Sequence, residues 1–165
     1  MGFAWLKSYE KDVPHSLKPY PKRTLLDVVS DVVHQRPNHT ALIFKGRRWS
    51  YLDLEKLSDA FANALVVQGV KRGDRVALLL PNSPQSMITQ FGVWKAGGIA
   101  VPINPLYTEH ELERLLNECG AESAVVLTRF YNKIKSLQSR TGIKRVIGTN
   151  IKEYLPPSIR FLFTL

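Results

Sequence analysis

Residues 76–112 read VALLLPNSPQSMITQFGVWKAGGIAVPINPLYTEHEL, and this stretch decides the fold. Its first apolar run ends at Pro81 and is continuous, as expected of a strand that is covered on both faces. Ser83 and Pro84 suit the cap and the first residue of a helix, and a glycine pair ends that helix before a second apolar run begins at Ile99. The stretch therefore reads strand, helix, strand, which is the unit of a parallel sheet.

Three further helix starts can be recognised in the sequence, two before this stretch and one near its end. A hydroxyl residue followed three positions later by a carboxylate can satisfy unpaired backbone N–H groups. This pattern begins at Thr24, Ser50 and Thr108. Each start is followed by apolar residues three or four positions apart, as on the buried side of a helix. A further basic, amphipathic helix is predicted over about 129–138.

Apolar runs between the predicted helices mark the strands. A short hairpin is predicted where Lys45 and Gly46 separate two short arms. Further strands are predicted over 76–80, 99–102, 124–127 and 145–147. Because strands and helices alternate, the sequence predicts an α/β fold in which a doubly wound, mostly parallel sheet is flanked by helices.

The chain divides into three predicted parts, an N-terminal extension over 1–23, an α/β body over 24–150 and an apolar tail over 151–165. The tail concentrates large apolar residues at Ile159, Phe161, Leu162, Phe163 and Leu165. A native terminus is usually polar, so we expect an element cut short, or one that lies on a membrane in a longer enzyme. Since its apolar side then lacks a cover, we expect the tail to drive self-association, or to be disordered when the chain is kept monomeric.

The charge of the chain is unevenly distributed. There are 23 Lys and Arg against 14 Asp and Glu, a net charge of +9, and after residue 128 the only acidic residue is Glu153. A basic end can meet nucleic acid or an anionic membrane, although charge runs are more often solvated surface. Only Phe130 and Tyr131 beside Arg129 supply the aromatic residues that a nucleic acid site needs. We therefore expect no nucleic acid partner.

The single cysteine, Cys119, excludes an internal disulfide and fits a reducing compartment. It follows Leu112, Leu115 and Leu116 at helical spacing, which favours packing over nucleophilic catalysis. The N-terminus becomes charged too early for a signal peptide, and no apolar run reaches the roughly 18 residues of a spanning helix. We expect a cytoplasmic protein, with peripheral membrane contact at most.

The residues present form no catalytic constellation. A triphosphate cradle needs converging backbone N–H groups, hence a glycine-rich loop that opens a helix, and the sequence contains neither common form. Gly97 and Gly98 follow a helix and are predicted to end it. None of the four histidines is spaced from another ligand residue as a metal site requires. The sequence predicts no metal site and no catalytic residue.

Four segments together carry a family resemblance. They are WSYLDLEKLSDAFANAL (49–65), GVKRGDRVALLLPNSPQ (69–85), FGVWKAGGIAVPINPLYTEHEL (91–112) and ECGAESAVV (118–126). Their succession closely resembles the amino-terminal part of the adenylate-forming acyl-CoA synthetases. The form NPLYTxxEL is most similar to the long-chain fatty-acid–CoA ligases among them.

This resemblance implies a two-step reaction. A fatty acid and ATP with Mg²⁺ give an acyl-adenylate and pyrophosphate, and CoA then displaces AMP to give the thioester. The family's phosphate loop, of the form TSGTTGxPKG, is not in this sequence, and neither are its nucleotide motifs and its C-terminal domain with the catalytic lysine. We therefore expect a part of such a ligase, truncated before the ATP-binding loop and inactive alone. ATP, Mg²⁺, CoA and the long-chain fatty acid would bind the full-length enzyme.

No catalytic residue of the family transfers onto this chain. Asn104, Pro105 and Tyr107, just after a predicted strand, are the candidates for lining the acyl or CoA side of the site. The competing interpretation is a rigid turn, because proline fixes φ and asparagine favours turns. Two other hypotheses remain for the chain as a whole: a stand-alone binding or regulatory module that kept the fold, and a basic nucleic-acid-binding domain.

Overall fold

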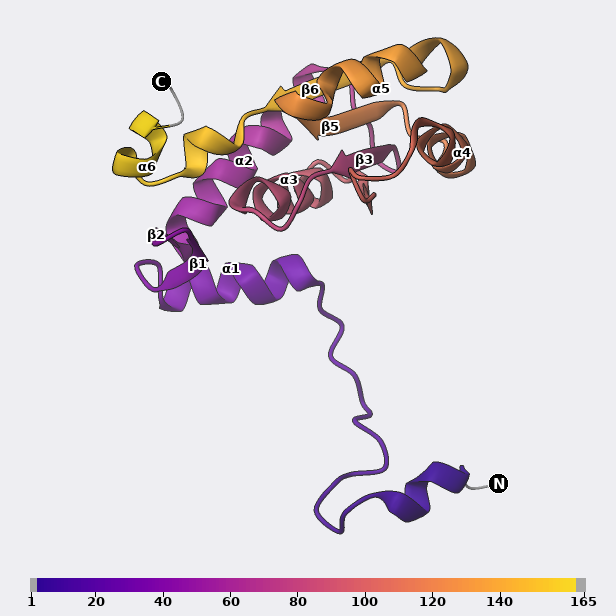
Figure 1. Ribbon diagram of the computed structural model, residues 1–165. Helices are drawn as coiled ribbons and strands as arrows, with labels where there is room; N and C mark the ends of the chain where they lie inside the picture. Colours follow the sequence, from indigo (N-terminus) through magenta and orange to yellow (C-terminus); the bar gives the residue numbers. More distant parts are fainter. Residues whose placement is uncertain (1–2, 163–165) are drawn as a thin grey trace.

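The structure is a computed structural model that describes residues 3–162 (Figure 1). The α-helices are α1 (Leu25–Gln35), α2 (Tyr51–Val67), α3 (Pro84–Lys95), α4 (Glu109–Cys119), α5 (Tyr131–Leu137) and α6 (Pro157–Leu162). The strands are β1 (Thr40–Phe44), β2 (Arg47–Ser50), β3 (Arg75–Leu79), β4 (Ile99–Pro102), β5 (Ser123–Leu127) and β6 (Arg145–Thr149). Short 3₁₀ turns are η1 (Ala4–Ser8), η2 (Thr128–Phe130), η3 (Gln138–Arg140) and η4 (Ile151–Tyr154).

Four strands form the central sheet in the order β4-β3-β5-β6. All pairings are parallel, and Val76 of β3 lies between Ala100 of β4 and Ser123 of β5. The connection through α3 runs from β3 to β4, and the connection through α4 returns past β3 to β5. Because right-handed crossovers in opposite directions place their helices on opposite faces, this order gives the predicted doubly wound sheet, which is confirmed.

Helices cover both faces of the sheet (Figure 1). On one face, Ala77 and Leu79 of β3 pack with Leu112 of α4 and Ile134 of α5. On the other face, alternate residues of β3 and β5 pack against Leu65 of α2 and against α3. Both sides of each central strand are therefore buried, which is why these strands read as continuous apolar runs.

All three predicted helix starts are confirmed as capping boxes. Thr24, Ser50 and Thr108 each accept a hydrogen bond from the backbone N–H three residues on, and the carboxylate there accepts one in return. The carboxylate accepts one hydrogen bond from the backbone N–H of the cap residue and another from its hydroxyl group. Both hydrogen bonds stabilise the charged form of the carboxylate. They hold three pKa values below their usual range, those of Asp27, Asp53 and Glu111.

The predicted hairpin is confirmed in β1 and β2, which pair antiparallel. Its turn residues Lys45 and Gly46 have φ of 51° and 86°, in the left-handed region that two-residue hairpin turns require. Trp49 of β2 is buried, and its ring centroid lies 6.0 Å from that of Tyr154. The hairpin thus packs against residues that follow β6.

Helix α3 begins as predicted, with Ser83 as its cap and Pro84 as its first residue. The spacing of its apolar residues predicts that Met87, Ile88, Phe91 and Trp94 form its buried stripe. This prediction is wrong at Met87, which is 37% exposed. The buried side instead includes Gln85 and Gly92, because α2 packs closely along it. Hydrophobic periodicity does not mark the small and polar residues that let two helices approach.

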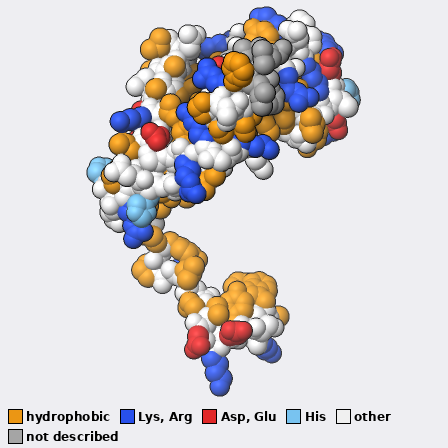
Figure 2. All heavy atoms as spheres, turned by 60° about the vertical axis from the view of Figure 1, so that its left-hand side comes forward, with side chains coloured by type: hydrophobic (Ala, Val, Ile, Leu, Met, Phe, Trp, Pro, Cys, Tyr) orange, Lys and Arg blue, Asp and Glu red, His pale blue; other side chains and the backbone are white. Residues whose placement is uncertain are grey.

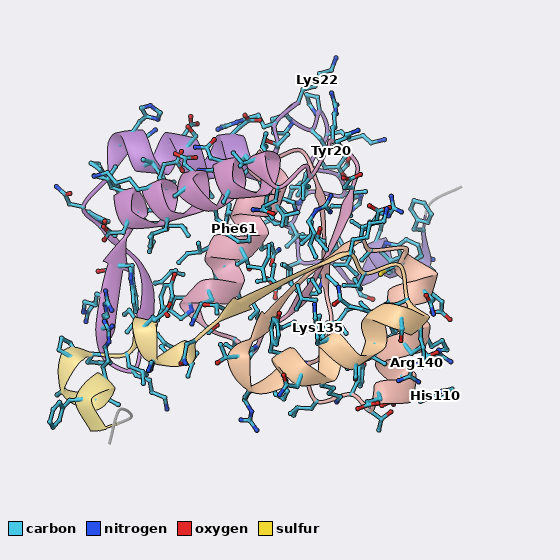
Figure 3. The ribbon with its side chains drawn as sticks, turned by 90° about the horizontal axis from the view of Figure 1, so that it is seen from above. Tyr20, Lys22, Phe61, His110, Lys135 and Arg140 are labelled. Atoms are coloured by element: carbon cyan, nitrogen blue, oxygen red, sulfur yellow. The ribbon has the colours of Figure 1, made fainter. Side chains whose placement is uncertain are left out.

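The basic helix predicted over 129–138 is only partly confirmed. Helix α5 is shorter and lies between the 3₁₀ turns η2 and η3. Basic residues near its end have acidic partners: Arg140 pairs with Glu113 at 2.7 Å and Lys144 with Glu122 at 2.8 Å. Arg140 lies near His110 at the start of α4 (Figure 3). On the face shown in Figure 2, the Lys and Arg side chains are scattered among apolar and uncharged ones.

Arg75, at the start of β3, binds the end of α4. Its Nε donates to the carbonyl oxygen of Cys119 at 3.2 Å, and its Nη2 donates to that of Gly120 at 2.8 Å. The sequence predicts a stop at Gly120, the glycine just past the last apolar residue of this helix, and the stop is confirmed: Gly120 adopts φ +61°, the left-handed conformation that ends many helices. The last carbonyl groups of α4 are therefore satisfied by a side chain that is distant in sequence.

Residues 3–23 extend away from the body and end in exposed apolar side chains (Figures 1 and 2). Phe3 and Trp5 stack there with ring centroids 4.4 Å apart. At the other end, packing continues past residue 150 to Leu155, which is buried. The following helix α6 carries Phe161, which is 67% exposed.

Part of the predicted apolar tail, namely Phe163, Leu165 and the side chain of Leu162, lies outside the described residues. Over residues 3–162, no helix combines the length and the hydropathy needed to cross a membrane.

Candidate functional site

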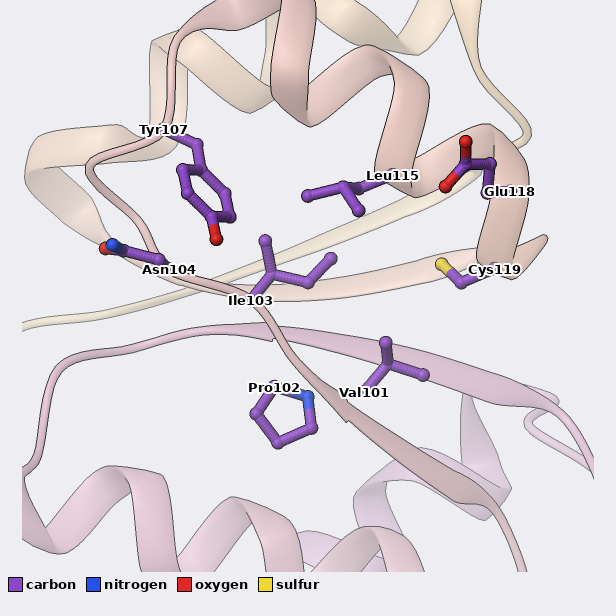
Figure 4. A pocket seen from close by; sticks show the side chains of 8 residues that line it. All are labelled: Val101, Pro102, Ile103, Asn104, Tyr107, Leu115, Glu118 and Cys119. Atoms are coloured by element: carbon purple, nitrogen blue, oxygen red, sulfur yellow. The ribbon is translucent and has the colours of Figure 1, made fainter.

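A hollow of about 440 Å³ lies beside β4, at one edge of the sheet (Figure 4). Strand β4 and the residues after it form one wall, and the C-terminal half of α4 forms the opposite one. The lining residues are Val101, Pro102, Ile103, Asn104, Tyr107, Leu115, Glu118 and Cys119. The hollow therefore has mainly apolar walls and a few polar groups, as small-molecule sites do.

Two of the three predicted site residues, Asn104 and Tyr107, line this hollow. Asn104 Oδ1 accepts a hydrogen bond from the Leu106 N–H at 3.0 Å, and the Asn104 carbonyl oxygen accepts one from the Tyr107 N–H at 3.3 Å. The turn that the sequence offered as the competing interpretation is thus present, and it holds Tyr107 at the hollow. Pro105 is buried and is not among the lining residues.

The position of this turn also depends on α5. Lys133 Nζ donates a hydrogen bond to the carbonyl oxygen of Tyr107. The turn is therefore held by its own backbone on one side and by a neighbouring helix on the other. A group held in this way needs little reordering when a ligand arrives.

Helix α4 contributes several lining residues that the sequence did not indicate as site residues, and β4 with Ile103 contributes the others. Cys119 was expected on the packing side of α4, and it does pack against the core, but it also borders the hollow. Its thiol donates to the carbonyl oxygen of Leu116 at 3.5 Å. Glu118 lies at the rim, where it pairs with Arg114 at 3.5 Å. No sequence pattern marks Glu118, because an exposed glutamate on a helix is common.

Neither a cluster of metal ligands nor a glycine-rich loop at a helix start is present among the described residues. Between residues 3 and 162, no group of three His, Cys, Asp or Glu side chains is placed to hold a metal ion. The helix α3 that follows β3 opens with Ser83 and Pro84 instead of a glycine-rich loop. The hollow beside β4 can hold an apolar body and orient it by a polar rim, but it lacks the convergent donors that phosphoryl chemistry needs.

Comparison with known proteins decides the family. The profile of a family described as AMP-binding enzyme matches residues 29–157, which is most of the chain. This chain belongs to the AMP-binding enzyme family. The resemblance that the four sequence segments carry is therefore confirmed.

Among the relatives of this AMP-binding family chain, a long-chain-fatty-acid–CoA ligase of Bacillus subtilis is 38% identical over 163 residues. The matched region is 98% of this chain and 29% of that ligase. A long-chain-fatty-acid–CoA ligase of Escherichia coli is 37% identical over 94% of this chain and 28% of its own length. The chain thus spans less than a third of the curated relatives that it matches.

Solved structures of similar proteins share the α/β fold with its parallel sheet. A long-chain-fatty-acid-CoA ligase from Archaeoglobus fulgidus is 28% identical, with a TM-score of 0.74 over 82% of this chain and 30% of that chain. An anthranilate CoA ligase in complex with anthranoyl-AMP is 28% identical, with a TM-score of 0.72 over 83% of this chain and 26% of that chain.

Proposed function

We propose that this chain forms the amino-terminal α/β layer of a long-chain-fatty-acid–CoA ligase. The enzyme would activate a fatty acid with ATP and Mg²⁺ as an acyl-adenylate and pass the acyl group to CoA. The observation that carries this proposal is the 38% identity to the Bacillus subtilis ligase across 98% of the chain. Sequence identity that extends over the whole chain is expected when two proteins have the same function, whereas a common short motif would give identity at one place only.

Within that enzyme, the hollow beside β4 would lie on the acyl or CoA side. Its walls Val101, Ile103 and Leu115 suit a hydrocarbon, and Asn104 and Tyr107 place polar groups at its end. The 165 residues themselves would supply a scaffold and part of a substrate wall, with the nucleotide held elsewhere in the enzyme.

A chimera tests this function directly. The matching stretch of the Bacillus subtilis ligase is replaced by residues 1–165, and formation of acyl-CoA from palmitate, ATP and CoA is measured. We expect turnover within about tenfold of the unmodified relative, since a scaffold of the same fold positions the remaining chemistry. The matched control is the same ligase without the stretch, which we expect to be inactive.

The alternative is a stand-alone, non-catalytic module of the same fold. A soluble, monodisperse chimera without ligase activity would favour that alternative. Activity of the chimera that depends on the inserted chain would exclude it.

A further inference from the structure

Residues 3–23, which we call the N-terminal arm, extend away from the body of the chain (Figure 1). No side chain of the arm is buried, and only Leu6 is half-buried. Six large apolar side chains have exposed fractions between 44% and 72%, those of Phe3, Trp5, Tyr9, Val13, Leu17 and Tyr20. Exposed apolar groups in such number mark an interaction surface, so the arm needs a partner.

The arm does not cover these side chains itself. Phe3 and Trp5 stack with ring centroids 4.4 Å apart, yet both rings stay exposed. Tyr9 meets His15 edge to face at 6.2 Å and is exposed as well. Among residues 3–23, the 3₁₀ turn η1 is the only helix or strand. The arm therefore presents a row of side chains and no shaped pocket, and its partner has to adapt to that row.

The charge of the arm indicates an anionic partner. Five of its residues are basic and two, Glu10 and Asp12, are acidic, so its net charge is +3. Arg23 pairs with Asp31 of α1, but the four lysines of the arm have no ion pair among the residues that the structure describes. These are Lys7, Lys11, Lys18 and Lys22, the last of which lies at the periphery of the molecule (Figure 3). Cations on an exposed segment attract an anionic surface.

The arrangement of the side chains favours a lipid surface. Figure 2 shows apolar side chains on one side of the end of the arm and charged side chains on the other. Segments divided in this way lie in the interface of a bilayer, where tryptophan and tyrosine are enriched. A nucleic acid would stack on the aromatic rings but would gain little from the aliphatic Val13 and Leu17. The boundary between headgroups and acyl chains accepts both kinds.

We propose that the N-terminal arm binds the surface of an anionic phospholipid bilayer. Its aromatic and aliphatic side chains enter the boundary between headgroups and acyl chains, and its lysines face the anionic headgroups. The body of the chain follows at Thr24, whose capping box fixes the start of α1. The inference goes beyond the proposed function and does not depend on it, because lipid binding needs neither ATP nor CoA.

Co-sedimentation with lipid vesicles tests the proposal. Residues 1–165 are mixed, without substrates, with vesicles of phosphatidylcholine alone and with vesicles that contain about one third phosphatidylserine. We expect at least tenfold stronger binding to the anionic vesicles. High salt should remove that preference, because it screens the lysines.

Matched substitutions locate the binding on the arm. Trp5→Ser should weaken binding to the anionic vesicles at least fivefold. Val67→Ser removes a side chain that is 84% exposed on α2 and should leave the binding unchanged.

The lysines are tested by a second pair of variants. Lys18→Glu with Lys22→Glu should reduce the binding to the anionic vesicles at least tenfold. Arg48→Glu with Lys135→Glu makes the same change of charge at two exposed positions of the body and should have less than half that effect on a logarithmic scale.

Equal binding to neutral and anionic vesicles, or equal effects of the arm variants and their controls, would overturn the proposal. So would loss of binding in Phe161→Ser but not in Trp5→Ser, which would assign the lipid surface to α6. Absence of vesicle binding, together with self-association or DNA binding that Trp5→Ser removes, would assign the arm to a second copy or to a nucleic acid.

The chimera with the Bacillus subtilis ligase shows whether the arm stays available in a longer protein. We expect it to bind anionic vesicles within about threefold of the isolated chain, and to lose that binding in Trp5→Ser. A folded chimera that does not bind vesicles would mean that the rest of the enzyme covers the arm, and this also overturns the proposal. A chimera that binds vesicles but has no ligase activity contradicts the proposed function and not the lipid surface.

Discussion

Gly92 of α3 lies directly against Phe61 of α2, and a Cβ atom at position 92 would lie 2.7 Å from the ring carbon Cδ1 of Phe61. The same Cβ would lie 3.0 Å from the backbone carbonyl oxygen of Ser58, which cannot rotate away. We expect Gly92→Ala to lower the free energy of unfolding by about 1–3 kcal/mol, as overpacking does. Urea unfolding measures it. The loss should appear although alanine is the better helix former.

Gly142→Ala is the control for this prediction. A Cβ there would meet only the carbonyl oxygen of Ala121, at 3.6 Å, which is an ordinary contact. We expect its effect on the free energy of unfolding to stay within about 0.5 kcal/mol. Equal effects of the two alanines would mean that α2 and α3 do not need the close approach.

Asp53 makes the stability of the chain depend on pH. The Ser50 N–H, and after it the Ser50 hydroxyl, lower the pKa of this carboxyl group in the folded chain. Its stabilising contribution is therefore present above the ordinary carboxyl pKa of about 3.9, and it is lost as the pH falls through the lowered folded value. We expect Asp53→Asn to reduce the loss of stability between neutral pH and about pH 3. Asp12→Asn, outside the body, should keep the parent profile in the same urea series.

Tyr107 should affect substrate binding in the chimera. Its ring closes one end of the hollow beside β4, so Tyr107→Ala should raise the KM for the fatty acid or for CoA several-fold. Leu106→Ala changes the neighbouring side chain, which is 74% exposed and does not line the hollow. Unchanged KM values in Tyr107→Ala, or equal changes in both variants, would remove Tyr107 from the substrate wall.

The isolated chain should catalyse neither step of the ligase reaction. Its described residues form no cluster of metal ligands, and its sequence contains no glycine-rich phosphate loop. We expect ATP–pyrophosphate exchange with palmitate to stay at background, with the unmodified Bacillus subtilis ligase as the positive control. Clear turnover by the pure chain would contradict this.

The chain should self-associate through α6, where Phe161 is 67% exposed. We expect Phe161→Ser, and a version that ends at Pro156, to be monomeric in size-exclusion chromatography with light scattering. The version that ends at Pro156 retains Leu155, which is buried, so the truncation leaves the packed body intact. Val67→Ser removes another exposed apolar side chain, far along the sequence on α2, and should leave the association intact. A monomeric parent chain would show this prediction to be wrong.

Features that depend on a few neighbouring residues could be predicted from the sequence. The capping boxes at Thr24, Ser50 and Thr108 are local, because the hydroxyl and the carboxylate that form each box lie within one turn. The same holds for the hairpin turn at Gly46 and for the turn that Asn104 forms. The alternation of strands and helices predicted the parallel sheet by the same kind of argument.

Features that depend on distant contacts could not be predicted in this way. The strand order β4-β3-β5-β6 depends on the direction in which each crossover connection runs along the sheet. The apolar runs in the sequence carry no information about that direction. The buried side of α3 follows from the approach of α2 to Gly92. The place of Glu118 in the hollow and the burial of Gln85 appear only when the elements are assembled.

The contact between Arg75 and the end of α4 bears on the order in which the chain folds. The first turn of α4 needs only Thr108 and Glu111, so it can form early and by itself. The carbonyl oxygen of Cys119, at its end, is paired with a guanidinium group 44 residues away, and closing so long a loop costs conformational entropy. Contacts of that kind form late in folding. The carbonyl groups at the end of α4 should therefore gain their partner Arg75 only when β3 has joined the sheet, after the first turn of the helix has formed.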